Sequence, residues 1–125
     1  MNQKIDNSAN KKGVIYAKAK SVAYESIDSQ IKLCREKMKA DSVEEVHAPI
    51  TDLVSANDTQ SSGLMEVLKL AENKSIDFVY TSGLDRLSRN SMVLLNFLSK
   101  LRGYNVTVVT PFQIFDTKKL EDLMS

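Results

Sequence analysis

Residues 75–90 constrain the fold of this chain more than any other part of the sequence. Residues 76–80 hold a single charge among β-branched and aromatic side chains, which is typical of a buried strand. A short turn with Gly83 follows, and after Asn90 comes an apolar run that indicates a helix. The sequence therefore predicts a strand whose far end delivers polar side chains to the start of a helix.

The turn after this strand carries one carboxylate, Asp85, and two guanidiniums, Arg86 and Arg89. Because the two arginines are three residues apart, we expect both on one side of a first helical turn, where backbone N–H groups already favour an anion. Two planar guanidiniums at one place suit a phosphodiester, since each can bind its oxygens bidentately. A solvated helix start with local ion pairs would show the same spacing.

Length and charge narrow the possible functions. A chain of 125 residues is expected to form one domain. A net charge of +1 does not indicate the basic face of a self-sufficient DNA-binding domain, so any nucleic-acid contact would depend on local clusters. No apolar run approaches the ~20 residues of a membrane span, and we expect a cytoplasmic protein. Cys34 has no disulfide partner and His47 no second metal ligand, so no metal is expected.

The other elements follow from periodicity and turn residues. A polar tail over residues 1–12 is expected to be disordered, and residues 50–60 to form an exposed loop. A helix over residues 91–102, apolar around more than half its circumference, is expected to end at Gly103. The remaining elements are strands at residues 14–17, 43–48, 104–110 and near Phe112 to Phe115, and helices that begin after Ser26, near Leu64 and at Thr117, the last running to Leu123.

This alternation of strands and helices predicts an α/β fold with three layers. Right-handed crossovers give a mostly parallel sheet of four to five strands with helices on both faces. In such a sheet, functional residues gather at the carboxyl ends of the strands. The exits of the first three predicted strands hold residues 18–21, 52–61 and 85–89, which together could surround one phosphate. We expect the loops that leave the first strand and the strand 76–80 to face each other.

The sequence Gly83-Leu84-Asp85-Arg86-Leu87-Ser88-Arg89-Asn90 behind a hydrophobic strand resembles the signature of the serine recombinases, the resolvase, invertase and large serine integrase family. Matches near Tyr16, Gln30, Asp52 and Gly63 extend the resemblance over about residues 13–110. It implies a resolvase-type catalytic domain over residues 13–125, without the family's C-terminal DNA-binding region. It also implies DNA and further copies of the chain as partners, in a dimer and a synaptic tetramer, and neither a cofactor nor a small-molecule substrate.

The resemblance implies a serine nucleophile just after the first strand, but two registers are possible. Counting forward from Tyr16 places the family's arginine position on Lys18 and its nucleophile position on Lys20. Counting backward from the helix start that contains Gln30 places the nucleophile on Ser21. A serine hydroxyl needs a base or a dense positive field to attack, and nearby lysines and arginines supply such a field. We expect Ser21 to attack a phosphate held by Lys18, Arg86 and Arg89, with Lys20 also at the DNA.

The exit of the second strand departs further from the family. Asp52 and Ser55 keep the family's spacing, but Ser61 stands where an arginine normally contacts the phosphate. The resemblance nevertheless places Ser55 and Ser61 at the DNA. Removing one cationic donor from a developing charge slows a reaction by the order of 10²-fold. Asp85 either transfers a proton near the leaving oxygen or orients Arg86, and the orienting role is the more conservative interpretation.

Three functions fit these residues to different degrees. The first is site-specific DNA recombination through a 5′-phosphoserine bond, which needs no cofactor because the ester retains the energy of the cut bond. The second is a catalytically impaired relative that acts as an assembly or DNA-positioning module, as Lys20 and Ser61 at catalytic positions would suggest. A flavodoxin-like or receiver-like domain is disfavoured, because a phosphate-binding glycine loop and paired acidic residues are missing after the first strand.

Overall fold

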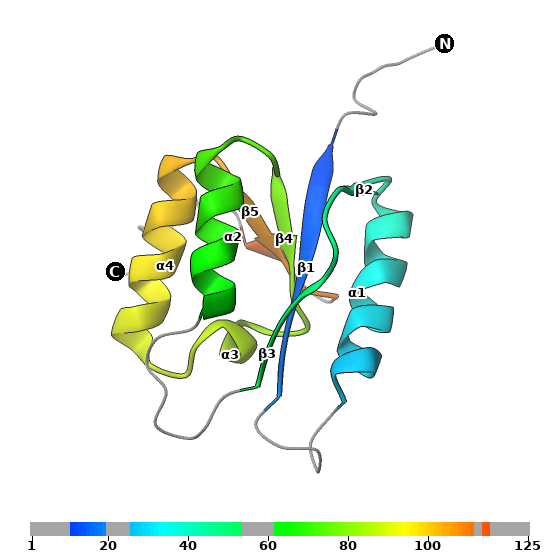
Figure 1. Cartoon of the computed structure of the whole chain (residues 1–125), viewed down its shortest axis with the longest axis horizontal. Helices are drawn as coiled ribbons and strands as arrows, with labels where there is room; N and C mark the ends of the chain where they lie inside the picture. Colours follow the sequence, from blue (N-terminus) through cyan, green and yellow to red (C-terminus); the bar gives the residue numbers. More distant parts are fainter. Residues whose placement is uncertain (1–10, 20–25, 54–61, 112–113, 116–125) are drawn as a thin grey trace.

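The computed structural model describes residues 11–19, 26–53, 62–111 and 114–115 (Figure 1). Residues 1–10 of the predicted polar tail and the predicted terminal helix from Thr117 to Leu123 lie outside these ranges. The prediction of disorder is wrong for Lys12, which begins the first strand. No helix within the described ranges is long and apolar enough to cross a membrane. The elements in chain order are β1 (Lys12–Ala19), α1 (Ile27–Ala40), β2 (Glu44–Glu45), β3 (Ile50–Leu53), α2 (Ser62–Glu72), β4 (Phe78–Tyr80), α3 (Leu84–Leu87), α4 (Ser91–Gly103), β5 (Thr107–Val109) and β6 (Ile114–Phe115).

The sheet is built around β1. One edge of β1 pairs with β4, and the other edge pairs first with β2 and then, further along, with β3. All of these pairings are parallel, as is β4 with β5, and only β6 is antiparallel. The described residues thus form six strands in five positions, since β2 and β3 share one edge of β1. The predicted mostly parallel sheet is confirmed.

Helices cover both faces of the sheet, as the sequence predicts. Figure 1 shows α1 on one side and α2 with α4 on the other. Successive side chains of β1 alternate between the two faces. Val14 and Tyr16 belong to the core that includes buried residues of α2 and α4, and Ile15 belongs to the core that includes Cys34 and Met38 of α1. Because Lys18 follows Tyr16 by two residues, its side chain lies on the side of α2 and α4.

The helices α1 and α4 each begin after a residue whose side chain caps the helix N-terminus. The Ser26 side chain accepts a hydrogen bond from the Ser29 backbone N–H, and α1 begins directly after Ser26, as the sequence predicts. Asn90 caps α4 in the same way, through the backbone N–H of Val93. Cys34 is fully buried, as expected for a small hydrophobic side chain. These caps fix where each helix leaves the carboxyl edge of the sheet.

The prediction of an exposed loop over residues 50–60 is wrong for its first part. Residues 50–53 form β3, which pairs with the second half of β1 from Tyr16 onward. Ile50 and Asp52 are buried while Thr51 and Leu53 are exposed, so the strand does alternate. The pattern is hidden in the sequence because one of the two buried positions is a carboxylate. The predicted strand over residues 43–48 shrinks to β2, and Pro49, which lacks a backbone donor, separates β2 from β3.

The end of α4 also differs from the prediction. Gly103 is the last residue of the helix, and Tyr104 is its C-cap. The left-handed residue expected just beyond a helix is Asn105, with a φ of 61°, and Gly103 does not adopt a positive φ. Asparagine tolerates this conformation better than most residues other than glycine. The turn into β5 therefore depends on Asn105.

Candidate active site

The carboxyl ends of β1 and β4 meet at one edge of the sheet. The two strands are parallel neighbours, which confirms that they end at the same edge. The chain leaves β1 towards β3 on one side and then crosses to β4 on the other side, so the strand order switches between these ends. Such a switch point is where open α/β sheets bind their ligands.

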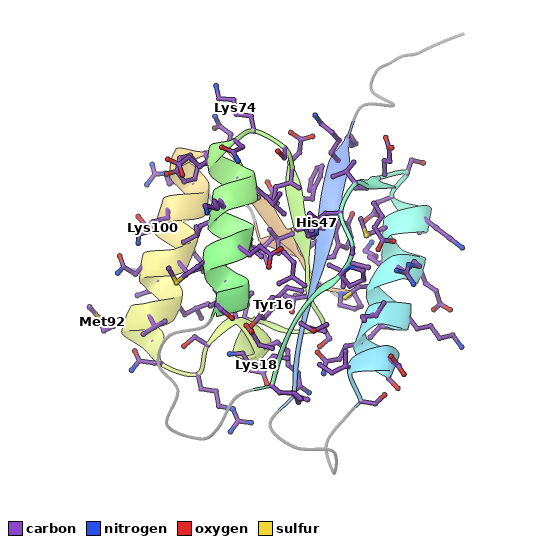
Figure 2. The ribbon with its side chains drawn as sticks, in the orientation of Figure 1. Tyr16, Lys18, His47, Lys74, Met92 and Lys100 are labelled. Atoms are coloured by element: carbon purple, nitrogen blue, oxygen red, sulfur yellow. The ribbon has the colours of Figure 1, made fainter. Side chains whose placement is uncertain are left out.

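Lys18 lies at this edge and connects β1 to α3 (Figure 2). Its Nζ donates a hydrogen bond to the backbone oxygen of Leu87, at 3.2 Å. Burial lowers the pKa of Lys18 below its usual value, and the positive charges of Arg86 and Arg89 act in the same direction. The carboxylates of Asp52 and Asp85 act in the opposite direction without outweighing burial. All four charged groups are therefore close enough to influence the charge of the Lys18 ammonium.

Asp52 is the centre of a buried hydrogen-bond network beside Lys18. The two residues are partners in the register of β1 and β3. The hydroxyl of Tyr16 donates to Asp52 Oδ2 at 2.6 Å, and the backbone N–H of Gly63 lies 3.2 Å from each carboxylate oxygen. The first turn of α2 has no acidic residue of its own. Asp52 therefore supplies the negative charge that stabilises the start of α2.

Gly63 is required for this close approach. A Cβ placed on Gly63 would come within 2.8 Å of Tyr16 Cε1 and would also collide with the Asp52 carboxylate. The absence of a side chain at this position lets the N-terminus of α2 pack directly on the carboxylate. The sequence match at Gly63 thus has a physical reason in the packing between α2 and β3.

Gln30 bonds to the last part of β1, on the edge where β4 has already ended. Its Oε1 accepts a hydrogen bond from the Lys18 backbone N–H at 3.1 Å, and its Nε2 donates to the Lys18 oxygen at 2.8 Å. The Gln30 side chain is fully buried. Its amide reproduces the pair of bonds that a neighbouring strand would make. The position of Lys18 is therefore fixed by side-chain bonds from α1.

Arg86 and Arg89 do not share one helical turn, so that prediction is wrong. The helix α3 ends at Leu87, and Ser88 has an extended backbone with φ −171° and ψ 146°. Arg86 belongs to α3, whereas exposed Arg89 lies in the connection to α4, which begins at Ser91. The break follows from burial, because Leu87 is fully buried and draws the chain onto the sheet. Leu87 packs in the same core cluster as buried residues of α2 and α4.

Half of the predicted site can be placed. The structure brings together Lys18, Asp85, Arg86 and Arg89 at the carboxyl edge. Lys20, Ser21, Ser55 and Ser61 lie outside the described residues. The forward count from Tyr16 and the backward count from Gln30 differ by one residue. Because Gln30 bonds directly to Lys18, both ends of this stretch are fixed, and the difference arises in the connection between Lys18 and Gln30.

Four residues that support the site through hydrogen bonds match the serine recombinase family in the sequence, but the sequence did not indicate a role for them. Tyr16, Gln30, Asp52 and Gly63 hold the end of β1 in place. One signal in the sequence was the glutamine between the apolar positions 27 and 31 of a predicted helix, and another was a helix start without an acidic residue. Both features indicate a polar bond to a distant element.

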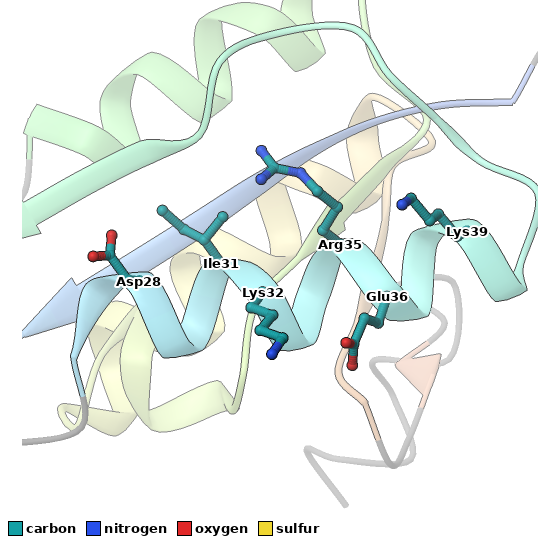
Figure 3. Close-up of a pocket in the computed structure, with 6 residues that line it drawn as sticks. All are labelled: Asp28, Ile31, Lys32, Arg35, Glu36 and Lys39. Carbon is teal, nitrogen blue, oxygen red and sulfur yellow. The ribbon is translucent and has the colours of Figure 1, made fainter.

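Potential metal ligands and a cavity along α1 are the remaining candidate features among the described residues. No group of three or more potential metal ligands occurs among them. A cavity of about 410 Å³ lies along α1, on the opposite side of the sheet from Lys18 (Figure 3). Its charges are mixed, and Arg35 already pairs with Glu45, so we interpret it as a solvated helix face. It is lined by Asp28, Ile31, Lys32, Arg35, Glu36 and Lys39.

The fold is an open α/β sheet with charged residues at its switch point, where sheets of this class bind their ligands. The sequence matches the family model described as Resolvase, N terminal domain, over residues 14–124, and the chain belongs to this family. No curated protein sequence matches the chain.

Solved structures agree with the family assignment. The N-terminal catalytic domain of TP901-1 integrase is similar with a TM-score of 0.77 and 25% identity, covering 91% of this chain and 88% of that chain. The C-terminal catalytic domain of ISC1926 TnpA, an IS607-like serine recombinase, has a TM-score of 0.71 and 26% identity, covering 90% and 78%. A resolvase family recombinase from Streptococcus pneumoniae, with a TM-score of 0.69, 14% identity and coverage of 92% and 88%, shares the fold. The chain is thus a serine recombinase catalytic domain.

Proposed function

We propose that this domain catalyses site-specific DNA recombination with Ser21 as the nucleophile. The Ser21 Oγ attacks a DNA phosphorus, and the bond from phosphorus to the 3′ oxygen of the neighbouring nucleotide breaks. The hydroxyl proton leaves Ser21, and the departing 3′ oxygen takes up a proton. One DNA end stays attached as a 5′-phosphoserine ester. After strand exchange in a tetramer, attack by a new 3′ hydroxyl reverses the step.

The observation that carries this proposal is the group of three cations at the carboxyl edge of the sheet. The positive charges of Arg86 and Arg89 both lie near enough to lower the pKa of Lys18. Guanidiniums bind phosphate oxygens bidentately, and clustered positive charge stabilises both an alkoxide and the transition state at phosphorus. Ser21 follows the end of β1 by two residues in the sequence, which supports its role beside these cations. Between the two registers we propose Ser21, because Lys20 has no hydroxyl.

The other predicted residues have supporting roles in this proposal. Lys20, Ser55 and Ser61 contact the DNA backbone. Asp85 directly precedes Arg86 in the sequence and orients that guanidinium. The partners are DNA and further copies of this chain.

A covalent DNA adduct tests the proposal. The protein is incubated with a pooled library of supercoiled plasmids with random inserts, quenched in detergent and digested with nuclease and protease. Mass spectrometry of the peptide that contains Ser21 should then show an added nucleotide. The adduct should be absent in Ser21→Ala and present in Ser99→Ala, which removes an exposed hydroxyl on α4.

Two outcomes would overturn the proposal. An adduct that persists in Ser21→Ala would place the nucleophile elsewhere. A wild-type protein that binds the plasmids but forms no adduct would favour the alternative function, a catalytically impaired module that positions DNA or assembles the complex. The serine at position 61, where the family has an arginine, is the feature that favours this alternative.

A further inference from the structure

The side chain of Lys18 begins from an unusually well fixed position. Both backbone groups of Lys18 are hydrogen-bonded to Gln30 of α1, and its neighbours Ala17 and Ala19 pair with β3. Ala17 is fully buried, and Ala19 nearly so. The Lys18 Cα therefore has little freedom, and the ammonium reaches its partners from a rigid strand.

The partner of the ammonium is a backbone oxygen between the two arginines. Leu87 is the last residue of α3, and the carbonyls at the end of a helix have no partner within the helix. Lys18 Nζ satisfies this carbonyl at 3.2 Å. Leu87 follows Arg86 directly and precedes Arg89 by two residues, so the contact holds the backbone that carries both guanidiniums.

We propose that Lys18 is a positioning residue, whose ammonium holds the end of α3 against β1 and so sets where Arg86 and Arg89 meet a DNA phosphate. The role of the two arginines rests on the proposed function, but the contact itself does not. Lys18 thus adds its charge to the site while it directs a hydrogen bond to the protein. The phosphate is bound by the guanidiniums that this bond positions.

The chemistry of lysine suits this task. An ammonium is a compact charge with three donors on a flexible stem, so one donor can bind a single carbonyl without the planar geometry of a guanidinium. The charged groups that face it are Asp52 of β3, Asp85 and Arg86 of α3, and Arg89 beyond it. A charge-assisted hydrogen bond is about twice as strong as a neutral one. The contact should therefore weaken as pH rises and Lys18 loses its proton.

Amide hydrogen exchange in the DNA-free protein tests the positioning role without any recombination. The backbone N–H groups of Arg86 and Ser88 donate to Gly83 and Leu84 within the segment. In Lys18→Met these amides should exchange about tenfold faster, the effect of losing one hydrogen bond that closes the segment. The amide of Leu94, in α4, should be unchanged. Lys100→Met, which removes an exposed lysine of α4, is the matched control and should exchange like the wild type.

A pH titration separates positioning from general structural support. The carbonyl ¹³C resonance of Leu87 should titrate in the wild type, with a midpoint below the usual lysine pKa because burial lowers the pKa of Lys18. In Lys18→Arg the carbonyl should show no such titration, since arginine keeps its proton. If the Arg86 and Ser88 amides exchange at the wild-type rate in Lys18→Met, the proposal is wrong. Weakened binding of inorganic phosphate with unchanged exchange would instead make Lys18 a direct phosphate ligand.

Failure of this inference and failure of the proposed function give different results. If the exchange and titration results hold but wild-type protein forms no DNA adduct, Lys18 still positions the arginine segment and the catalytic proposal fails. If the adduct forms while exchange is unaffected by Lys18→Met, the catalytic proposal holds and the positioning role of Lys18 fails.

Discussion

The two ends of β1 are held by different kinds of bond. At the amino end, Gly13 pairs with both β2 and β4. Lys12 pairs with β2, and its backbone oxygen accepts a bond from the Asp77 backbone N–H just before β4. At the carboxyl end, β3 pairs with one edge, but β4 has already ended at Tyr80. The side chain of Gln30 takes the place of a strand there.

This difference explains how a parallel sheet makes room for a polar site. Where strands pair with both edges of β1, the backbone groups are used in pairing and no space remains for a site. Where a side chain takes the place of a strand, the chain after β4 can turn away from β1. The turn after β4 can then place α3 over the end of β1, where Lys18 meets Leu87. If the comparison is right, substitutions at the carboxyl end should cost more stability than matched substitutions at the amino end, because side-chain bonds are lost when a single residue changes.

The largest difference should come from adding a methyl group to a glycine at each end. Gly63→Ala forces the Asp52 carboxylate away from both Tyr16 and the start of α2. We expect it to lower the free energy of unfolding by about 3 kcal/mol, from overpacking and the broken hydrogen bonds. Gly13→Ala meets Met38 Cε and Val43 Cγ1, each at 2.9 Å. The end of the flexible Met38 side chain can move, so the substitution should cost about 1 kcal/mol.

Urea unfolding followed by circular dichroism measures both glycine variants. Gly103→Ala serves as a control, because a Cβ there meets nothing within 4 Å and alanine favours a helix. It should be neutral or slightly stabilising. A larger loss for Gly13→Ala than for Gly63→Ala would contradict the comparison.

A smaller difference should follow from removing the side-chain bonds that reach each end of β1. Gln30→Leu keeps the side-chain volume but removes both bonds to the Lys18 backbone, and we expect a loss of about 2 kcal/mol. At the amino end, Asp77 Oδ2 accepts a bond from the Lys12 backbone N–H in an exposed setting. Asp77→Ala should cost about 0.5 kcal/mol, because water replaces the lost acceptor. Thermal unfolding of both variants at pH 7 checks the ratio, and equal losses would count against a special role for Gln30.

The sequence predicted the parts of the fold that depend on local patterns. The apolar run before Gly83 and the helix after Asn90 are both present as β4 and α4. The sequence could not reveal β3, because the burial of Asp52 depends on the hydroxyl of Tyr16, which lies 36 positions away. The extended backbone at Ser88 was missed for a similar reason, since it follows from the burial of Leu87 against other elements.

The same limit applies to the candidate site. Charged residues at strand ends indicate which edge of the sheet is polar, and the charge of Arg86 does influence Lys18 there. Sequence spacing could not show that the ammonium of Lys18 binds a backbone oxygen. Every residue has a backbone carbonyl, so the sequence does not indicate which one a side chain will bind. The choice between Lys20 and Ser21 also lies beyond periodicity, since it depends on the length of a connection between two fixed points.

A pair of tyrosines extends the comparison to the two faces of the sheet. Tyr16→Phe removes a buried donor from Asp52, and we expect a loss of about 1.5 kcal/mol. Tyr80→Phe removes a donor from Asp41 on the opposite face, where Lys37 still pairs with that carboxylate, so the loss should be about 1 kcal/mol. Denaturant unfolding at pH 7 measures both, and a larger loss at Tyr80 would break the comparison.

The tyrosine pair also makes a prediction for alkaline pH. Burial and the bond to Asp41 raise the pKa of Tyr80. The unfolded chain therefore loses the tyrosine proton first, and stability should fall as pH rises above about 10, the usual tyrosine pKa. Tyr80→Phe should flatten this fall, which denaturant unfolding at a series of pH values from about 8 to about 11 measures on both sides of the usual tyrosine pKa. An unchanged slope would show that Tyr80 does not contribute to it.

The smallest effect is expected from the ion pair beside the amino end of β1. Arg35 binds Glu45 through two bonds of 2.8 Å, and Glu45 is the β2 partner of Gly13. Because the pair is largely exposed, Glu45→Gln should lower stability by no more than a few tenths of a kcal/mol. The bond to Arg35 lowers the pKa of Glu45, so this contribution is present above the usual glutamate pKa of about 4.3 and is lost as pH falls through the lowered value. Unfolding curves of wild type and Glu45→Gln should therefore converge in acid, and a loss as large as that of Gln30→Leu would mean that side-chain bonds matter equally at both ends of β1.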